Sequence, residues 1–341
     1  MNDLLVGLLS ALLSTNQTAV ASNLLMKQTG IPLKIAFDPL ALELKRIMDL
    51  DDQAREEVDE LLEKEKAPKS DQPEIKKLTT NTVIEKKLDA VKVAYEEFIA
   101  KHPTYAKAMN AFGAFLNETS NDDLALKEWL KAKELDPTDA AVWNNLGGYY
   151  AHNGGLTNAF THYAKAISIN PSEPSYLWNL GTLMYVYRSD ASAFLKKEPL
   201  QVLEDAMAVY RRALKIETNN FLMSADYAQS FYGFPAPQSG NAAADLKTLQ
   251  DRAGQALTAW TNAHSLARDE VERQGVHLHY ARWTMGMGRF TESRAALNAV
   301  TNLMYQLNKT TLLKKLANME SHATNTTPAA ASPTPPAPAS P

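Results

Sequence analysis

Histidine and carboxylate side chains could carry out acid–base chemistry, but their spacing in this chain forms no known catalytic motif. The seven histidines are scattered. His277 and His279 are two residues apart, so on a helix they would face different directions. No H-E-x-x-H, phosphate-binding loop or G-x-S-x-G sequence is present. Paired carboxylates occur only in charge-rich stretches, where solvent exposure explains them. We therefore predict a protein that is not an enzyme and that needs no metal or other cofactor.

Composition excludes several further kinds of chemistry. The chain has no cysteine, which rules out disulfides, zinc–thiolate sites, a cysteine nucleophile and a lipoprotein anchor. Its formal net charge is -4 over 341 residues. This mild charge gives neither a basic patch for nucleic acid nor a polybasic run for a membrane surface. We expect a protein or peptide partner and no nucleic acid.

A regular spacing organises the middle of the chain. Glycine recurs at positions 113, 147 and 181, and proline at positions 103, 137 and 171. Both residue types repeat every 34 residues in a fixed relative phase. A period near 34 residues is the length of one helix–turn–helix unit that stacks on copies of itself.

The unit at residues 140–173 carries the fullest version of the pattern. Its marked residues are Trp143, Leu146, Gly147, Tyr150, Ala159, Tyr163, Ala166 and Pro171. This sequence resembles the tetratricopeptide repeat, whose pattern is W-x2-L-G-x2-Y, then A-x3-F, then P. The resemblance implies an all-α fold, a right-handed α-solenoid of stacked helix–turn–helix units that mediates protein–protein interaction.

Each marked residue has a packing role. Gly147 has no β-carbon, so two helices can approach closely there. The rings of Trp143, Tyr150 and Tyr163 fill the space between helices with apolar area. Pro171 cannot continue a helix and separates one unit from the next. We expect these residues in the core rather than in a binding site.

The repeats are expected to cover residues 81–320. Their predicted units are 81–105, 106–139, 140–173, 174–220, 221–270 and 274–307. The fourth and fifth of these units contain insertions, at residues 188–203 and 233–249, between their two helices. Insertions in repeat arrays often lie on one face and carry recognition, although they could equally be tolerated surface excursions.

The flanks of the array are expected to differ from the repeats. Residues 1–65 are predicted to be an appended helical segment, in which Asp38 caps a helix that starts at Pro39. The acidic half of that helix, from Asp51 on, is expected to be solvated. Residues 66–80, which begin KAPKSDQP, are predicted to be a linker. The Pro/Ala-rich tail at 321–341 should be disordered, because it can bury too little apolar surface.

An apolar run at residues 4–13 bears on localisation. Its length and the Ala19-Val20-Ala21 ending resemble a secretory signal, yet no Lys or Arg precedes it. The run is too short to span a bilayer. We expect a cytoplasmic protein in which this run packs as a helix. Export is the alternative if residues 1–21 are a signal peptide, and membrane association stays open.

The resemblance also implies where a ligand would sit. In the family, the first helices of successive units line a concave groove. The groove residues to which we assign peptide binding are Asn110, Asn144, Asn145, Trp178, Asn179, Tyr185, Asp226, Gln229 and Tyr232. Asn117, His152 and Thr182 occupy matching positions.

The amides of Asn145 and Asn179 share one repeat position and would form a short ladder. An amide both donates and accepts, so it can hold the backbone of an extended peptide. Trp178, Tyr185 and Tyr232 would be exposed aromatic anchors. In the alternative reading, the asparagines solvate the surface or bridge neighbouring helices.

One kind of groove ligand can be excluded. Chaperone-adaptor members of the family hold a partner's C-terminal carboxylates with Lys and Arg side chains. In the first register, the matching positions here are Asn110, Ala114, Asn145, Ser175 and Asn179. In the register one unit later they are Asn144, Gly148, Asn179, Leu222 and Asp226. Since neither set contains a cation, a dicarboxylate clamp is not expected.

Two functions remain. The first is a non-catalytic scaffold or adaptor that docks an extended peptide or a helix in the groove. The alternative is an exported or membrane-associated assembly component that uses the apolar N-terminal segment and the insertions. The sequence leaves the oligomeric state and the identity of the partner open.

Overall fold

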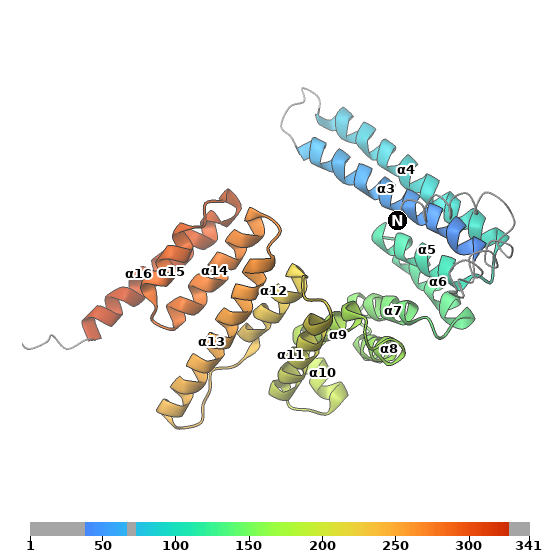
Figure 1. Ribbon diagram of the computed structural model, residues 1–341. Coiled ribbons are helices and arrows are strands. Elements are labelled where there is room, and N and C mark those ends of the chain that lie inside the picture. Colours follow the sequence, from blue (N-terminus) through green and yellow to red (C-terminus); the bar gives the residue numbers. More distant parts are fainter. Residues whose placement is uncertain (1–37, 67–72, 327–341) are drawn as a thin grey trace, which may run out of the picture. The chain divides into compact units, whose positions relative to one another are not determined.

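Helices account for nearly all of the regular structure. The computed structural model describes residues 38–66 and 73–326. In these ranges the chain forms 14 α-helices, two short 3-10 helices and no strand (Figure 1). The prediction of an all-α fold is confirmed. The chain divides into two compact units, residues 1–135 and 136–341, and the apolar run at 4–13 lies outside the described residues.

The first unit consists of two helical pairs. Its helices are α3 (Pro39–Lys66), α4 (Pro73–Lys101), α5 (Ala106–Glu118) and α6 (Asp122–Leu135). The side chain of Asp38 accepts a hydrogen bond of 3.0 Å from the Leu40 amide, so the predicted cap of α3 is present. The linker expected at 66–80 is too long, because α4 already begins at Pro73. Proline suits the first turn of a helix, where its missing N–H costs nothing.

The expectation of a fully solvated acidic half of α3 is wrong at one residue. Asp51 is 2% exposed. It accepts hydrogen bonds of 2.9 and 2.8 Å from Arg55, and the Tyr95 hydroxyl approaches it to 3.4 Å. A buried carboxylate needs such partners. Because α3 pairs with α4 and Tyr95 of α4 reaches Asp51, α3 is a packing partner of α4 rather than an appendage.

The second unit continues the pairing of first and second helices. Its helices are α7 (Ala140–His152), α8 (Leu156–Ile169), α9 (Pro174–Val186), α10 (Arg188–Leu195), α11 (Pro199–Ile216), α12 (Phe221–Ser230), η1 (Phe231–Gly233), α13 (Ala242–Leu266), α14 (Glu270–Gly286), α15 (Phe290–Asn298), η2 (Leu303–Tyr305) and α16 (Gln306–Thr326). The main pairs are α7 with α8, α9 with α11, α12 with α13, and α14 with α15.

The periodic glycines lie where a second helix presses an aromatic ring against the first. A β-carbon on Gly147 would lie 2.7 Å from the ring of Tyr163, and one on Gly181 would lie 3.1 Å from that of Tyr210. Real β-carbons do not tolerate the first of these distances. The packing role expected for the repeat glycines is thus seen in the structure.

The two insertions take different forms. The first contains the short helix α10, whose Phe194 stacks on Phe160 with ring centroids 5.1 Å apart. The second is an irregular segment followed by two extra turns at the start of α13. Arg188, in the first insertion, donates a 2.7 Å hydrogen bond to the carbonyl of Gly233, in the second. The insertions therefore contact each other.

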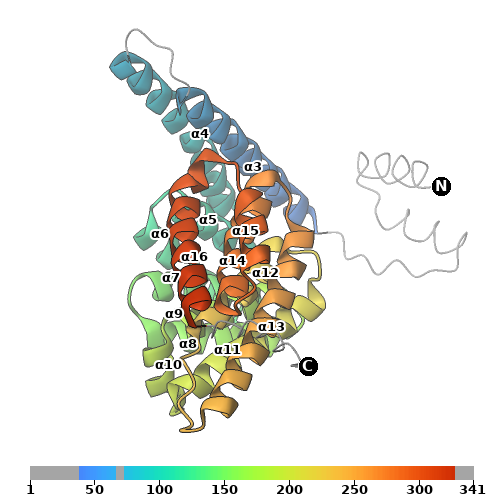
Figure 2. The ribbon, with the colours of Figure 1, turned by 90° about the vertical axis from the view of Figure 1, so that its left-hand side faces the viewer.

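A final helix closes the C-terminal end of the second unit. α16 packs on α14 and α15 (Figure 2). Leu312 and Leu316 of α16 are buried in the same apolar cluster as residues of α14 and α15. The turn between α14 and α15 uses Gly288 at a positive φ of 73°, a conformation that glycine adopts without strain. Because α16 continues to Thr326, the first residues of the tail expected at 321–341 are helical. The rest of that tail lies outside the described residues.

Candidate functional site

Side-chain contacts join α7, α9 and α12, the first helices of three successive repeats. We call the surface that these three helices form the first-helix face. The Asn179 amide donates a 2.9 Å hydrogen bond to the Asn144 side chain. The sequence predicts that Asn145 pairs with Asn179 in a ladder. Asn145 follows Asn144 on α7 and has an interaction of its own. The contact between Asn144 and Asn179 matches the alternative in which asparagines bridge neighbouring helices.

The aromatic residues of α9 link it to α12. The indole N–H of Trp178 donates to Asp226 at 2.8 Å, and the Tyr185 hydroxyl donates to the Gln229 carbonyl at 3.4 Å. Burial raises the pKa of Asp226, while the bond from Trp178 works against that rise. Trp178 and Tyr185 are half-buried, so they are less exposed than the sequence suggested.

Tyr232 belongs to an aromatic cluster that the sequence did not predict. Its hydroxyl lies 3.2 Å from His279 Nδ1, and its ring stacks on Trp283 at 4.9 Å. His279 stacks in turn on Trp260 at 4.1 Å with an interplanar angle of 7°. Burial, with a smaller effect of Arg282, lowers the pKa of His279 to about 4. No local sequence pattern indicated His279 as the stacking partner of Trp260.

The first-helix face contains a cavity of 270 Å³ between α7 and α9. It is lined by Ala151, His152, Tyr163, Asn179, Thr182, Leu183, Val186 and Tyr187. The cavity therefore combines amide, hydroxyl and imidazole groups with an apolar wall. No Asp, Glu, Lys or Arg lines it.

The assigned residue Asn110 is not among the residues that line this cavity. It is on α5, in the first compact unit, and its carbonyl accepts a 3.2 Å hydrogen bond from the Trp129 indole. Of the nine assigned residues, only Asn179 lines the cavity between α7 and α9. His152 and Thr182, which occupy matching repeat positions, also line this cavity.

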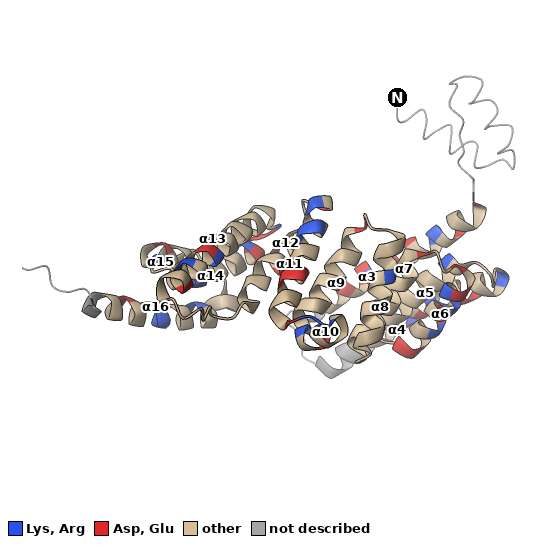
Figure 3. Cartoon of the chain, turned by 90° about the horizontal axis from the view of Figure 1, so that it is seen from below, with Lys and Arg blue, Asp and Glu red and all other residues tan. Residues whose placement is uncertain are grey.

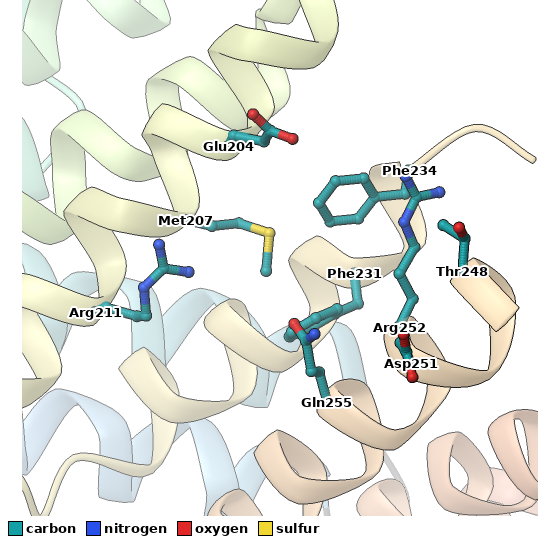
Figure 4. A pocket seen from close by; sticks show the side chains of 9 residues that line it. All are labelled: Glu204, Met207, Arg211, Phe231, Phe234, Thr248, Asp251, Arg252 and Gln255. Atoms are coloured by element: carbon teal, nitrogen blue, oxygen red, sulfur yellow. The ribbon is translucent and has the colours of Figure 1, made fainter. Parts of the chain in front are cut away.

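A second cavity, of 460 Å³, lies between α11 and α13 at the second insertion (Figure 4). It is lined by Glu204, Met207, Arg211, Phe231, Phe234, Thr248, Asp251, Arg252 and Gln255. These residues come from two second helices and from the segment that joins α12 to α13. Sequence reasoning identified the insertion but not this cavity.

Charged groups and potential metal ligands are spread along the part of the chain that the structure describes. Basic and acidic residues are interspersed along the helices rather than gathered in one patch (Figure 3). Across residues 38–66 and 73–326, no three His, Asp or Glu side chains are arranged to hold a metal ion. None of the described helices combines the length and apolar composition of a membrane-spanning segment.

Comparison with known proteins agrees with this architecture. A family model described as the tetratricopeptide repeat matches residues 140–173. The matched segment is the unit that carries the fullest repeat pattern in the sequence. Among solved structures, this chain is similar to pilF of Pseudomonas aeruginosa, with a TM-score of 0.51 and 15% identity. The match covers 70% of this chain and 95% of that one, and at such low identity it shows the fold alone.

One curated relative shares part of the sequence. The BBSome complex member BBS4 homolog of Drosophila melanogaster is 28% identical over 88 residues. The aligned part is 26% of this chain and 18% of the relative, so the chain spans less than a fifth of that protein.

Proposed function

We propose that this protein is a non-catalytic adaptor that binds an extended segment of a partner protein on its first-helix face. The observation that carries the proposal is the cavity between α7 and α9. Stacked helical repeats form extended binding surfaces, and a cavity on such a surface can receive one anchoring side chain of a bound peptide.

The lining of the cavity suggests the chemistry of that anchor. Leu183, Val186 and Tyr187 offer apolar area, and Val186 is 58% exposed. Because no charged residue lines the cavity, a neutral apolar side chain fits it best. Asn179 and Thr182 lie beside these residues and can hydrogen-bond the peptide backbone, each bond contributing about 0.5–1.5 kcal/mol.

Selection from a random peptide library, followed by fluorescence anisotropy of the enriched peptides, tests this proposal. We expect peptides with an apolar anchor to bind the wild type and to lose at least about tenfold in affinity with Val186→Asp, since a carboxylate would lie in the apolar wall. Val93→Asp, at a 49% exposed site on α4, is the matched control and should bind as the wild type does. Equal binding by both variants would reject the first-helix face as the site.

We further propose that the protein acts in the cytoplasm. No Lys or Arg precedes the apolar run at 4–13, which supports this choice over export. Mass spectrometry of the protein from its native host should find an N-terminus at Met1 or Asn2. A mature N-terminus at Ser22 would instead favour the exported assembly component.

A further inference from the structure

The cavity at the second insertion is separate from the first-helix face, because its walls are the second helices α11 and α13. Its volume of 460 Å³ falls in the range of about 300–1,000 Å³ that is typical of binding pockets. Phe234 and Thr248, which help to line it, belong to the insertion itself. A regular repeat without the insertion would lack these two side chains.

The wall on the side of the insertion is held in place by Arg252. Its guanidinium lies 4.5 Å from the centre of the Phe234 ring and donates a 2.9 Å hydrogen bond to the Pro235 carbonyl. These contacts fix the irregular segment against α13. Met207 and Phe231, each 3% exposed, form an apolar floor beneath it.

Two exposed charges flank this floor on α11. Glu204 precedes Met207 by three residues, and Arg211 follows it by four, so all three lie on one face of the helix. Figure 4 shows the two charged groups on either side of the Met207 thioether. In the described part of the chain, neither Glu204 nor Arg211 has an ion pair or a side-chain hydrogen bond. Seven residues of helix separate them by about 10.5 Å, so they do not pair with each other.

We propose that this cavity binds a helix of a partner protein that carries an apolar side chain with a basic residue one turn to one side and an acidic residue one turn to the other. The apolar side chain would cover Met207, Phe231 and Phe234. The basic and acidic residues would pair with Glu204 and Arg211, whose spacing matches one turn on each side of the anchor. This inference rests on the proposed adaptor function and adds a second contact surface to it.

Three fluorescein-labelled helical peptides test this complementarity by anisotropy. Each peptide has a central Leu in an Ala/Gln background and one charged residue a helical turn away on each side. The two charged residues are Lys and Glu in the mixed peptide, Lys and Lys in the second, and Glu and Glu in the third. The wild type should bind the mixed peptide at least about tenfold more tightly than the other two. Arg211→Glu should shift the preference to the Lys/Lys peptide, and Glu204→Lys should shift it to the Glu/Glu peptide. The comparison does not depend on the direction in which the peptide helix binds.

Arg212→Glu is the matched control, because this exposed neighbour makes the same charge change outside the cavity lining. It should keep the preference for the mixed peptide, and circular dichroism should show all variants folded. Replacement of the central Leu by Gln should abolish binding. Val186→Asp should leave binding of the mixed peptide unchanged, which separates this inference from the test of the first-helix face. Absence of binding to all three peptides, or an unchanged preference in the charge variants, would overturn the proposal.

Discussion

At the scale of single residues, glycines and aromatic rings set how closely two helices of one repeat approach. Gly147 and Tyr163 are 16 positions apart in the chain, yet they meet across the pair formed by α7 and α8. The sequence predicted a close approach at this glycine from its period. It could not predict which atoms meet, because that depends on the rotation of each helix about its axis.

Gly147→Ala should destabilise the protein by about 1–3 kcal/mol, because the new β-carbon would overlap the Tyr163 ring at 2.7 Å. Urea denaturation followed by circular dichroism measures the change. Gly254→Ala is the control, since Gly254 lies inside α13 with no atom within 4 Å of an added β-carbon. That substitution should stabilise the protein by about 0.5–1 kcal/mol. Equal destabilisation by both changes would contradict the close-packing explanation.

The half-buried His279 makes stability depend on pH. In the unfolded chain the imidazole takes up a proton below its ordinary pKa of 6.5, whereas in the folded protein it stays neutral until about pH 4. Its contribution is therefore complete above pH 6.5 and is lost as the pH falls towards 4. The slope is at most about 1.4 kcal/mol per pH unit.

His279→Phe should flatten the decrease in unfolding free energy between pH 6.5 and 4, because the ring still stacks on Trp260 but no longer titrates. Denaturation curves of both proteins at several pH values measure the difference. His277, whose pKa burial also lowers, is present in both and cancels in the comparison. Parallel pH profiles would show that His279 does not carry this effect.

At the scale of helices and loops, the two insertions act as one structural feature. Each interrupts a different repeat, but Arg188 reaches from one to the Gly233 carbonyl of the other. The sequence indicated that both lie at the same edge of their repeats. It did not indicate the contact, since the residues are 45 positions apart and belong to insertions without a repeat phase.

Arg188→Ala should increase amide hydrogen exchange in residues 231–241, because the segment loses its hydrogen bond to the first insertion. The helices α9 and α11 should keep their protection. Lys197→Ala is the comparison variant, since it removes an ion pair with Asp205 in which both side chains are partly exposed. Such pairs contribute little to stability. If exchange in 231–241 is the same in both variants, the contact between the insertions has no role in ordering the segment.

At the scale of the whole molecule, repeat proteins gain stability from contacts between neighbouring helices. Residues 136–341 form one compact unit, and its clusters of buried apolar residues, such as those around Trp260 and Leu297, contain only residues of that unit. The second unit thus has a hydrophobic core of its own.

A fragment of residues 136–326 should fold alone and show helical circular dichroism with a cooperative thermal transition. Loss of the first unit should leave this transition in place, because the second unit has its own hydrophobic core. The full-length chain measured in the same buffer is the reference. A fragment that melts without cooperativity would show that the second unit depends on the first.

The sequence by itself determined the helical repeat, the helix pairs and most of the core, because these follow from a period of 34 residues and from contacts within one pair. The same reasoning failed at Asp51, which is buried beside Tyr95, a residue 44 positions away in the chain. Tertiary structure alone decided that Asn179 bonds Asn144, that His279 stacks on Trp260 and that cavities lie beside α9 and α11. These features depend on how one helix pair rotates against the next. That rotation results from the packing of many side chains at once. The residue type at a single repeat position therefore does not predict it.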